Sequence, residues 1–218
     1  MIRLENVTMS FPAGSERKMV ADDLSIEFHE RKCVGILGRN GAGKSTLLRM
    51  IAGIIPPQRG KIVIEGSVSW PVGFAGSFHP DLTGAQNVRF LARVYGVDTK
   101  QLIDFVNDFS ELGAHFHQPL RSYSSGMRAR LAFGASMGIR FDHYLFDEVT
   151  SVGDAGFRSK SEAVIRSRLD HSGAIIVTHS MGLVSNLCDA AVILENGKLM
   201  WFNDVERAIR RHRVMMGT

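Results

Sequence analysis

The stretch that decides the fold spans residues 38–46 and reads Gly38-Arg39-Asn40-Gly41-Ala42-Gly43-Lys44-Ser45-Thr46. It fits the phosphate-loop pattern G-x-x-x-x-G-K-[ST]. The apolar run 33–37 before it predicts a buried strand, and residues 45–51 predict a helix. In that setting the glycines let the backbone wrap around a phosphate, with loop amides and the helix N-terminus pointing at the anion. The glycine spacing does not match G-x-G-x-x-G and disfavours a dinucleotide site.

Two side chains of this loop have predicted roles. We expect Lys44 to reach the β- and γ-phosphates of a bound nucleotide, and Ser45 to offer its hydroxyl to Mg²⁺. The alternative is a glycine-rich turn with a chance lysine. The strand before the loop and the helix after it favour the phosphate-binding interpretation.

Composition is that of an ordinary globular protein. The 218 residues are 44% hydrophobic and 22% charged, which suits one domain or one domain with a subdomain. No run approaches the roughly 18 apolar residues that cross a bilayer, and no signal-peptide core begins the chain, so we expect a cytoplasmic location. Cys33 and Cys188 lie in apolar runs, which favours buried, reduced thiols.

Charge excludes little by itself. The net charge of +4 is no signature of nucleic-acid binding, and we expect no nucleic-acid partner. Positive charge is densest on a predicted terminal helix that begins near Asp204, at Arg207, Arg210, Arg211 and Arg213. A solvated helix end is the first interpretation of this cluster, and contact with an anionic membrane or an acidic partner is the alternative.

Strands and helices alternate along the second half of the chain. Strands are predicted at residues 2–7, 19–28, 61–65, 144–146, 174–177, 190–194 and 198–202, and helices at 83–95, 99–109, 125–137, 157–169 and 181–187. Thr83 and Gln86 fit a capping box. The alternation predicts an α/β protein with a mainly parallel sheet. We expect one domain, residues 1–218, in which the helical stretch from about 84 to 138 is a subdomain.

Polar side chains follow two of the later strands. Asp147 and Glu148 end the strand 144–146, where Asp147 would hold Mg²⁺ and Glu148 would orient and deprotonate the attacking water. A solvated strand end is the usual interpretation, but the upstream phosphate loop favours the functional one. His179 ends the next strand and would contact the γ-phosphate.

A third polar segment, residues 121–128, precedes a helix. Small polar residues there predict a helix cap, and a helix start is also an anion site. Because this segment lies far from the phosphate loop in sequence, a second copy of the chain is a candidate to supply it across an interface.

These motifs come in the order found in the ATP-binding cassette (ABC) transporter ATPases, which the chain resembles over nearly its whole length. The resemblance implies the phosphate-loop NTPase fold of the ABC type, with an antiparallel β part, and ATP and Mg²⁺ as ligands. Ser124 and Gly126, with Ser125 between them, match the signature motif of that family. Asp154 falls in the loop that links two nucleotide sites. Phe11 falls where an aromatic ring stacks on adenine, with a buried strand aromatic as the alternative.

One departure from the family narrows the resemblance. The segment 69–80 lacks the glutamine that usually senses the γ-phosphate, and Gln86 comes too late and is explained by capping. We assign no residue to that role. Segments 69–71, 78–87, 123–127 and 146–154 resemble ATPases that export polysaccharides, and the short chain is most similar to the capsular polysaccharide members.

The resemblance implies a motor subunit on the cytoplasmic side of the inner membrane. Its expected partners are a second copy in an ATP-sandwich homodimer, an integral-membrane permease and, indirectly, periplasmic or outer-membrane polysaccharide-export components. Trp70, Phe74 and Phe78 are candidates for the permease groove, or else for subdomain core. The alternatives are an ABC ATPase for another glycan, lipid or drug, a soluble non-transport ABC ATPase, and a phosphate-loop kinase or GTPase.

Overall fold

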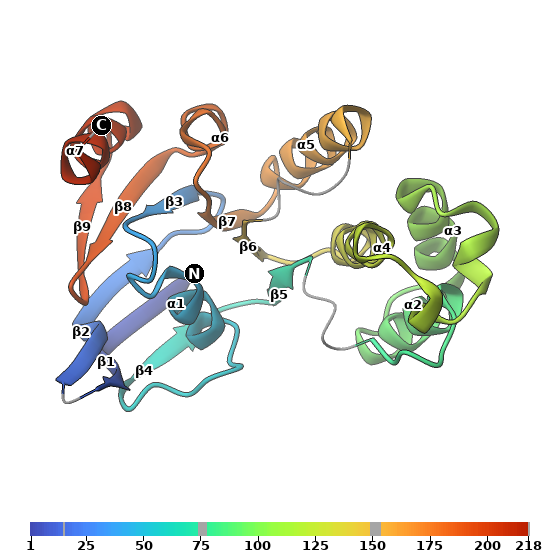
Figure 1. The fold of residues 1–218 in the computed structure, drawn as a ribbon, viewed down its shortest axis with the longest axis horizontal. Helices are drawn as coiled ribbons and strands as arrows, with labels where there is room; N and C mark the ends of the chain where they lie inside the picture. Colours follow the sequence, from blue (N-terminus) through green and yellow to red (C-terminus); the bar gives the residue numbers. More distant parts are fainter. Residues whose placement is uncertain (15, 74–77, 149–153, 218) are drawn as a thin grey trace. The chain divides into compact units, whose positions relative to one another are not determined.

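The computed structural model describes residues 1–14, 16–73, 78–148 and 154–217 (Figure 1). Its contacts divide the chain into two compact units. The first unit comprises Met1–Pro71, Phe141–Glu148 and Leu169–Thr218, and the second comprises Val72–Arg140 and Val149–Arg168. The chain therefore leaves the first unit twice and returns to it twice.

A six-stranded sheet forms the centre of the first unit, with the strand order β5-β6-β7-β3-β8-β9. Its strands are β3 (Cys33–Leu37), β5 (Val68–Val72), β6 (His143–Asp147), β7 (Gly173–Val177), β8 (Ala190–Glu195) and β9 (Lys198–Phe202). Strand β3 pairs in parallel with β7 and β8, and β6 pairs in parallel with β7. Among these recorded pairings of the described residues, that of β9 with β8 is the antiparallel one. The predicted mainly parallel sheet is confirmed.

A second sheet is antiparallel and has the order β2-β1-β4. Its strands are β1 (Ile2–Ala13), β2 (Glu16–Phe28) and β4 (Arg59–Ile64). The predicted end of the first strand at residue 7 is wrong, because β1 and β2 continue as a ribbon to the pair Ala13 and Glu16. Register shifts between Leu4 and Ser10 interrupt the alternation that marks a strand in sequence.

Helix α1 (Lys44–Ile51) supplies the core that the two sheets share. Its side chains Leu47, Leu48 and Ile51 are fully buried in one cluster with residues of both sheets, among them Leu4 of β1 and Ile36 of β3. On the other side of the sheet, α6 (Met181–Leu187) and α7 (Val205–Met216) form a smaller cluster that includes Leu37, the residue just before the phosphate loop. Strand β3 is therefore packed on both of its faces.

The second unit is helical. It contains α2 (Gly84–Val94), α3 (Thr99–Ser110), α4 (Ser125–Gly138) and the short 3-10 turns Gly113–His117 and Leu120–Ser122. Most of α5 (Ala155–Leu169) also belongs to it, which the predicted subdomain did not include. The capping box of Thr83 and Gln86 is confirmed in both of its hydrogen bonds. Phe109 of α3 contacts the rings of Phe133 and Phe157 at 5.5 and 5.4 Å between centroids, which ties α3, α4 and α5 together.

Several smaller expectations can be compared with the structure. Cys33 and Cys188 are free thiols with their Sγ atoms 3.4 Å apart. Trp70 packs edge-to-face on Phe141 in the first unit and is therefore not core of the helical subdomain. Phe78 is half-buried, and Phe74 lies outside the described residues. Among the described residues, no helix has the length and apolarity to cross a membrane.

Two buried histidines of the first unit predict how stability depends on pH. Burial lowers the pKa of His143 from 6.5, and the nearby N-terminal ammonium lowers it further, whereas Asp142 and Glu30 oppose the shift. Burial also lowers the pKa of His212, against the effect of the Gly38 backbone as a hydrogen-bond partner. The unfolded chain therefore binds protons at these sites at a higher pH than the folded chain does. We expect the free energy of unfolding to fall as the pH drops below 6.5.

Urea unfolding at about pH 8, 6.5 and 5.5 measures this slope. His143→Asn should make the slope shallower even if it lowers stability at every pH. His171→Asn, which removes an exposed histidine, is the matched control and should leave the slope unchanged. A wild-type slope that stays flat over this range would contradict the prediction.

Candidate functional site

At two positions of the phosphate loop, Gly38 and Gly43, the backbone conformation and the close packing leave no room for a side chain. Gly38 has φ +149°, and a Cβ there would lie 2.5 Å from the carbonyl oxygen of Leu194. Gly43, which caps α1, has φ +104°, and a Cβ there would lie 2.5 Å from Cγ1 of Val20. The loop is thus packed against β8 at its start and against β2 at its end.

Lys44 is held by the loop in which it stands. Its Nζ donates hydrogen bonds to the carbonyl oxygens of Gly38 at 2.8 Å and Arg39 at 3.0 Å, and the side chain is nearly buried. Burial lowers the pKa of the Lys44 ammonium, whereas the charges of Glu148 and Asp147 act in the opposite direction. The ammonium is therefore pre-positioned at the N-terminus of α1, which has no side-chain cap and no acidic residue in its first turn. Free amides and a cation at this point favour an anion.

Two oxygen ligands meet beside Lys44. The hydroxyl of Ser45, in the first turn of α1, donates to Oδ1 of Asp147 at the end of β6 over 2.9 Å. A hydroxyl and a carboxylate are ligands that Mg²⁺ accepts, with phosphate oxygens and waters completing its octahedron. The described residues contain no group of three or more His, Cys, Asp or Glu that would hold a metal alone. The pair therefore fits an ion that arrives with its nucleotide.

Glu148, the residue after β6, has a strained backbone. Its φ is +57°, in the left-handed region that is uncommon for residues other than glycine. A hydrogen bond of 2.9 Å from its N–H to the carbonyl of Val177 on β7 holds it there. His179 follows β7, and its Nε2 lies 3.1 Å from Oε1 of Glu148. Strain of this kind is typical of functional positions.

Lys44, Ser45, Glu148 and His179 line one cavity of about 520 Å³ in the first unit, and Asp147 is bonded to Ser45 at its border. Its lining residues are Phe11, Lys18, Val20, Asn40, Gly41, Gly43, Lys44, Ser45, Thr46, Glu148 and His179. Phe11 is 40% exposed, so it is not the buried strand aromatic that the sequence left as an alternative. Arg39 and Ala42 line an adjoining cavity instead. Two further lining residues, Lys18 and Val20, come from β2 and belong to no sequence motif, so the sequence did not predict them.

The remaining predicted residues belong to the second unit. The hydroxyl of Ser124 caps α4 by accepting a 3.2 Å hydrogen bond from the N–H of Met127, which confirms the predicted cap. Ser125 and Gly126, in the exposed first turn, have no acidic residue beside them in that turn. The start of α4 is therefore open to an anion.

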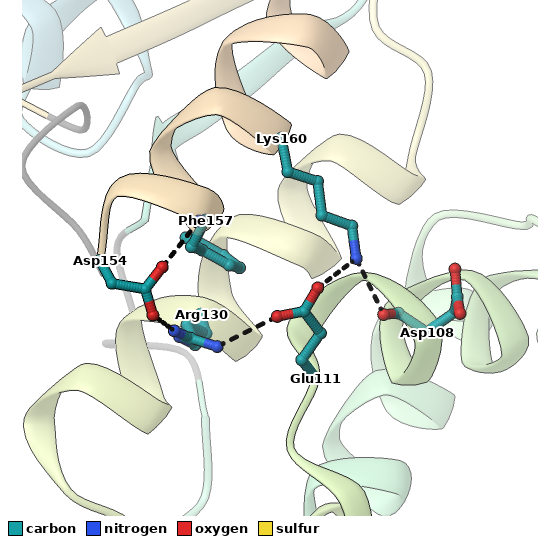
Figure 2. Close-up of polar contacts among 6 residues, drawn as sticks. All are labelled: Asp108, Glu111, Arg130, Asp154, Phe157 and Lys160. Carbon is teal, nitrogen blue, oxygen red and sulfur yellow. Dashed lines mark hydrogen bonds and ion pairs between the residues drawn. The ribbon is translucent and has the colours of Figure 1, made fainter.

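Asp154 links α4 and α5 of the second unit (Figure 2). Its Oδ1 accepts the N–H of Phe157 at 2.9 Å and so caps α5, and its Oδ2 accepts from Arg130 of α4 at 2.8 Å. The N–H of Phe157 and the Arg130 guanidinium lower the pKa of the Asp154 carboxyl. Arg130 also stacks over the Phe157 ring at 4.6 Å and pairs with Glu111, which in turn binds Lys160. The end of α3, the signature helix α4 and the start of α5 form one polar cluster.

The strand, glycine loop, helix and strand-end carboxylates of the first unit define a phosphate-loop nucleoside triphosphatase. A family model described as "ABC transporter" matches residues 21–151, more than half of the chain. The polysialic acid transport ATP-binding protein KpsT of Escherichia coli is 45% identical over 98% of this chain and 97% of its own length. The capsule polysaccharide export ATP-binding protein CtrD of Neisseria meningitidis serogroup B is 42% identical over 95% and 96%.

A solved structure agrees with the fold. The dimeric, post-hydrolysis structure of the ATP-binding cassette MJ0796 bound to ADP and Pi superposes with a TM-score of 0.78 at 21% identity, covering 92% of this chain and 98% of the other. The chain belongs to the ABC transporter family, and it is an ATP-binding ATPase of that family.

The contacts of Asp154 separate two of its roles by mutation. Asp154→Asn keeps an oxygen that can cap α5 but removes the charge that pairs with Arg130, whereas Asp154→Ala removes both. We expect the melting temperature to fall in the order wild type, Asp154→Asn, Asp154→Ala. In an Arg130→Met background the difference between wild type and Asp154→Asn should shrink. Equal losses for both Asp154 variants would show that capping contributes nothing.

Proposed function

We propose that this chain is the ATP-hydrolysing motor subunit of an exporter for a capsular polysaccharide. The observation that carries the hydrolytic part is the single cavity that collects Lys44, Ser45, Glu148 and His179, with Asp147 bonded to Ser45. The cargo rests on the identity of 42–45% to proteins named for polysialic acid transport and capsule polysaccharide export. An exporter of another glycan, a lipid or a drug is the remaining alternative.

In this proposal each part of the cavity acts on one part of ATP. Phe11 stacks on adenine, the amides of residues 38–46 surround the phosphates, and Lys44 binds the β- and γ-phosphates. Ser45 and Asp147 hold Mg²⁺, which neutralises phosphate charge when it is bound. The negative charge of the nucleotide then replaces the carbonyl oxygens that Lys44 contacts in the structure.

Glu148 and His179 would manage the attacking water. The Glu148 carboxylate accepts a proton from the attacking water. The water oxygen forms a bond to the γ-phosphorus while the bond between the γ-phosphorus and the bridging oxygen breaks, and that oxygen leaves with ADP. His179 Nε2, at 3.1 Å from Glu148 Oε1, fixes that carboxylate and is also within reach of the γ-phosphate end of the cavity. The left-handed backbone at Glu148 keeps its side chain at this place.

A second copy of the chain would complete the nucleotide site. Ser124, Ser125 and Gly126 present an exposed helix start that suits a γ-phosphate bound to the phosphate loop of the partner copy. Asp154, anchored in the same unit through Arg130, would border that interface. Contact with the γ-phosphate, which ADP lacks, lets ATP favour the closed dimer. Closure would drive a membrane permease, with periplasmic or outer-membrane export components further along and the motor on the cytoplasmic side of the inner membrane.

Glu148→Gln tests the hydrolytic assignment. The amide keeps the shape of the carboxylate but is not a base, so we expect ATP binding to persist while kcat falls by roughly 100-fold or more, the usual value of general-base catalysis. Steady-state ATPase rates and nucleotide-binding calorimetry measure the two effects. Glu195→Gln is the matched control, because Glu195 also ends a strand of the sheet but lines only the adjoining cavity. A kcat within a few-fold of wild type would remove Glu148 from the role of dominant base.

Affinity purification from native membranes tests the transport assignment. Tagged Glu148→Gln protein with ATP and Mg²⁺ should hold the closed dimer and retain its permease. We expect mass spectrometry to identify a multi-spanning permease together with polysaccharide-export components. Recovery of ribosomal or DNA-repair proteins without a permease would contradict the transport function and indicate a soluble ABC ATPase. Recovery of a permease for lipids or drugs would contradict only the proposed cargo.

A further inference from the structure

Lys18 lies at the boundary of the nucleotide cavity without belonging to any motif. It stands on β2 directly opposite Phe11 of β1, and residues opposite each other in an antiparallel pair project from the same face. Both side chains line the cavity of about 520 Å³. Val20, two residues further along β2, lines it too, as the two-residue period of a strand requires.

The ammonium of Lys18 reaches the phosphate loop itself. A Cβ placed on Gly41 would lie 3.0 Å from Nζ of Lys18, so the charge stands over the middle of the loop. Lys18, Asn40 and Gly41 also line the adjoining cavity of about 510 Å³, where Arg17 and Arg39 add two more positive charges. The lysine therefore borders the phosphate loop at Gly41.

Lys18 differs from the other lysines of the two sheets in how its ammonium is paired. Its side chain is exposed, and within the part of the chain that the structure describes it forms no ion pair with a carboxylate. Other lysines of the two sheets are paired, Lys61 with Glu5 at 3.0 Å and Lys198 with Asp22 at 2.8 Å. Lys44, in contrast, is nearly buried and donates to the loop carbonyls. The cavity thus has one ammonium inside the loop and a second, uncommitted one above it.

We propose that Lys18 is a second phosphate-binding lysine, which holds the phosphate chain of the nucleotide from the β2 side while Phe11 holds the base. This inference rests on the proposed ATP site and adds a residue to it. A polyphosphate carries several negative charges, and Lys44 with the loop amides neutralises only part of them. Lys18 neutralises a further part of this charge and determines affinity rather than the rate of the chemical step, because its ammonium lies beside Gly41 and, among the described residues, forms no recorded bond to Glu148 or His179.

Calorimetric titration of the full chain with ATP, ADP and adenosine, in EDTA to prevent turnover, tests the proposal. Lys18→Met should weaken the binding of ATP and ADP by about 5- to 10-fold at low salt, the effect of one partly exposed charge-assisted contact. Adenosine binding should be unchanged because adenosine has no phosphate. The difference between variant and wild type should narrow as salt rises, because exposed charges are screened. Lys18→Arg should restore most of the affinity, and kcat at saturating ATP should change less than KM.

Arg17→Met is the matched control. The substitution removes the same charge from the position just before Lys18 on β2, and Arg17 lines the adjoining cavity. Equal losses in Lys18→Met and Arg17→Met would overturn the proposal and indicate a general field effect. So would an unchanged affinity in Lys18→Met, or an equal loss for adenosine. Lys44→Ala distinguishes a failure of the Lys18 inference from a failure of the ATP site. If Lys44→Ala weakens ATP binding and Lys18→Met does not, only this inference is wrong, whereas full ATP affinity in Lys44→Ala would overturn the ATP site itself.

Discussion

The close contact of the phosphate loop with two neighbouring strands is the constraint on which the nucleotide site depends. Gly38 approaches the carbonyl of Leu194 on β8, and Gly43 approaches Val20 on β2, each so closely that a Cβ would collide. The loop can therefore keep its amides pointing inward only while both sheets of the first unit hold their places. Apolar packing holds them there. Leu37 packs in one cluster with residues of α6 and α7, and Leu47 and Leu48 are buried in a cluster that contains residues of both sheets. The shape of an anion site is thus set by apolar packing around it.

Sequence patterns predicted the sheet well where burial is complete. Strands β3, β7 and β8 are continuous apolar runs between polar residues, and a buried parallel strand leaves that signature. Strand β5 escaped prediction because Pro71 stands inside it, and Pro cannot donate to a sheet ladder. The extension of β1 beyond residue 7 was missed for another reason. Register shifts between Leu4 and Ser10 break the alternation of buried and exposed residues there, and residues 11–13 beyond them are all exposed.

The candidate site was predictable as far as motifs reach and no further. The loop, the carboxylates after β6 and His179 after β7 each follow a buried strand, so parallel topology alone brings them to one edge of the sheet. Lys18 has no such signature. Its face depends on the register of β1 against β2, and that register shifts between Leu4 and Ser10. A prediction that continues the two-residue alternation through a bulge places every later side chain on the wrong face of the strand. The register that pairs Lys18 with Phe11 is visible only in the folded ribbon.

The path of the chain places Glu148, the proposed general base, at a boundary between the two units. Directly after Glu148 the chain passes from the first unit to the second. On one side of this crossing, Glu148 is held in a left-handed backbone conformation by the carbonyl of Val177. On the other side, Asp154 is fixed by the cap of α5 and by Arg130, which stands on the helix that begins with the signature residues (Figure 2). Only residues 149–153 separate the two anchors. Because residues other than glycine seldom adopt the left-handed region, the hydrogen bond to Val177 is what fixes the direction in which the Glu148 side chain leaves the backbone.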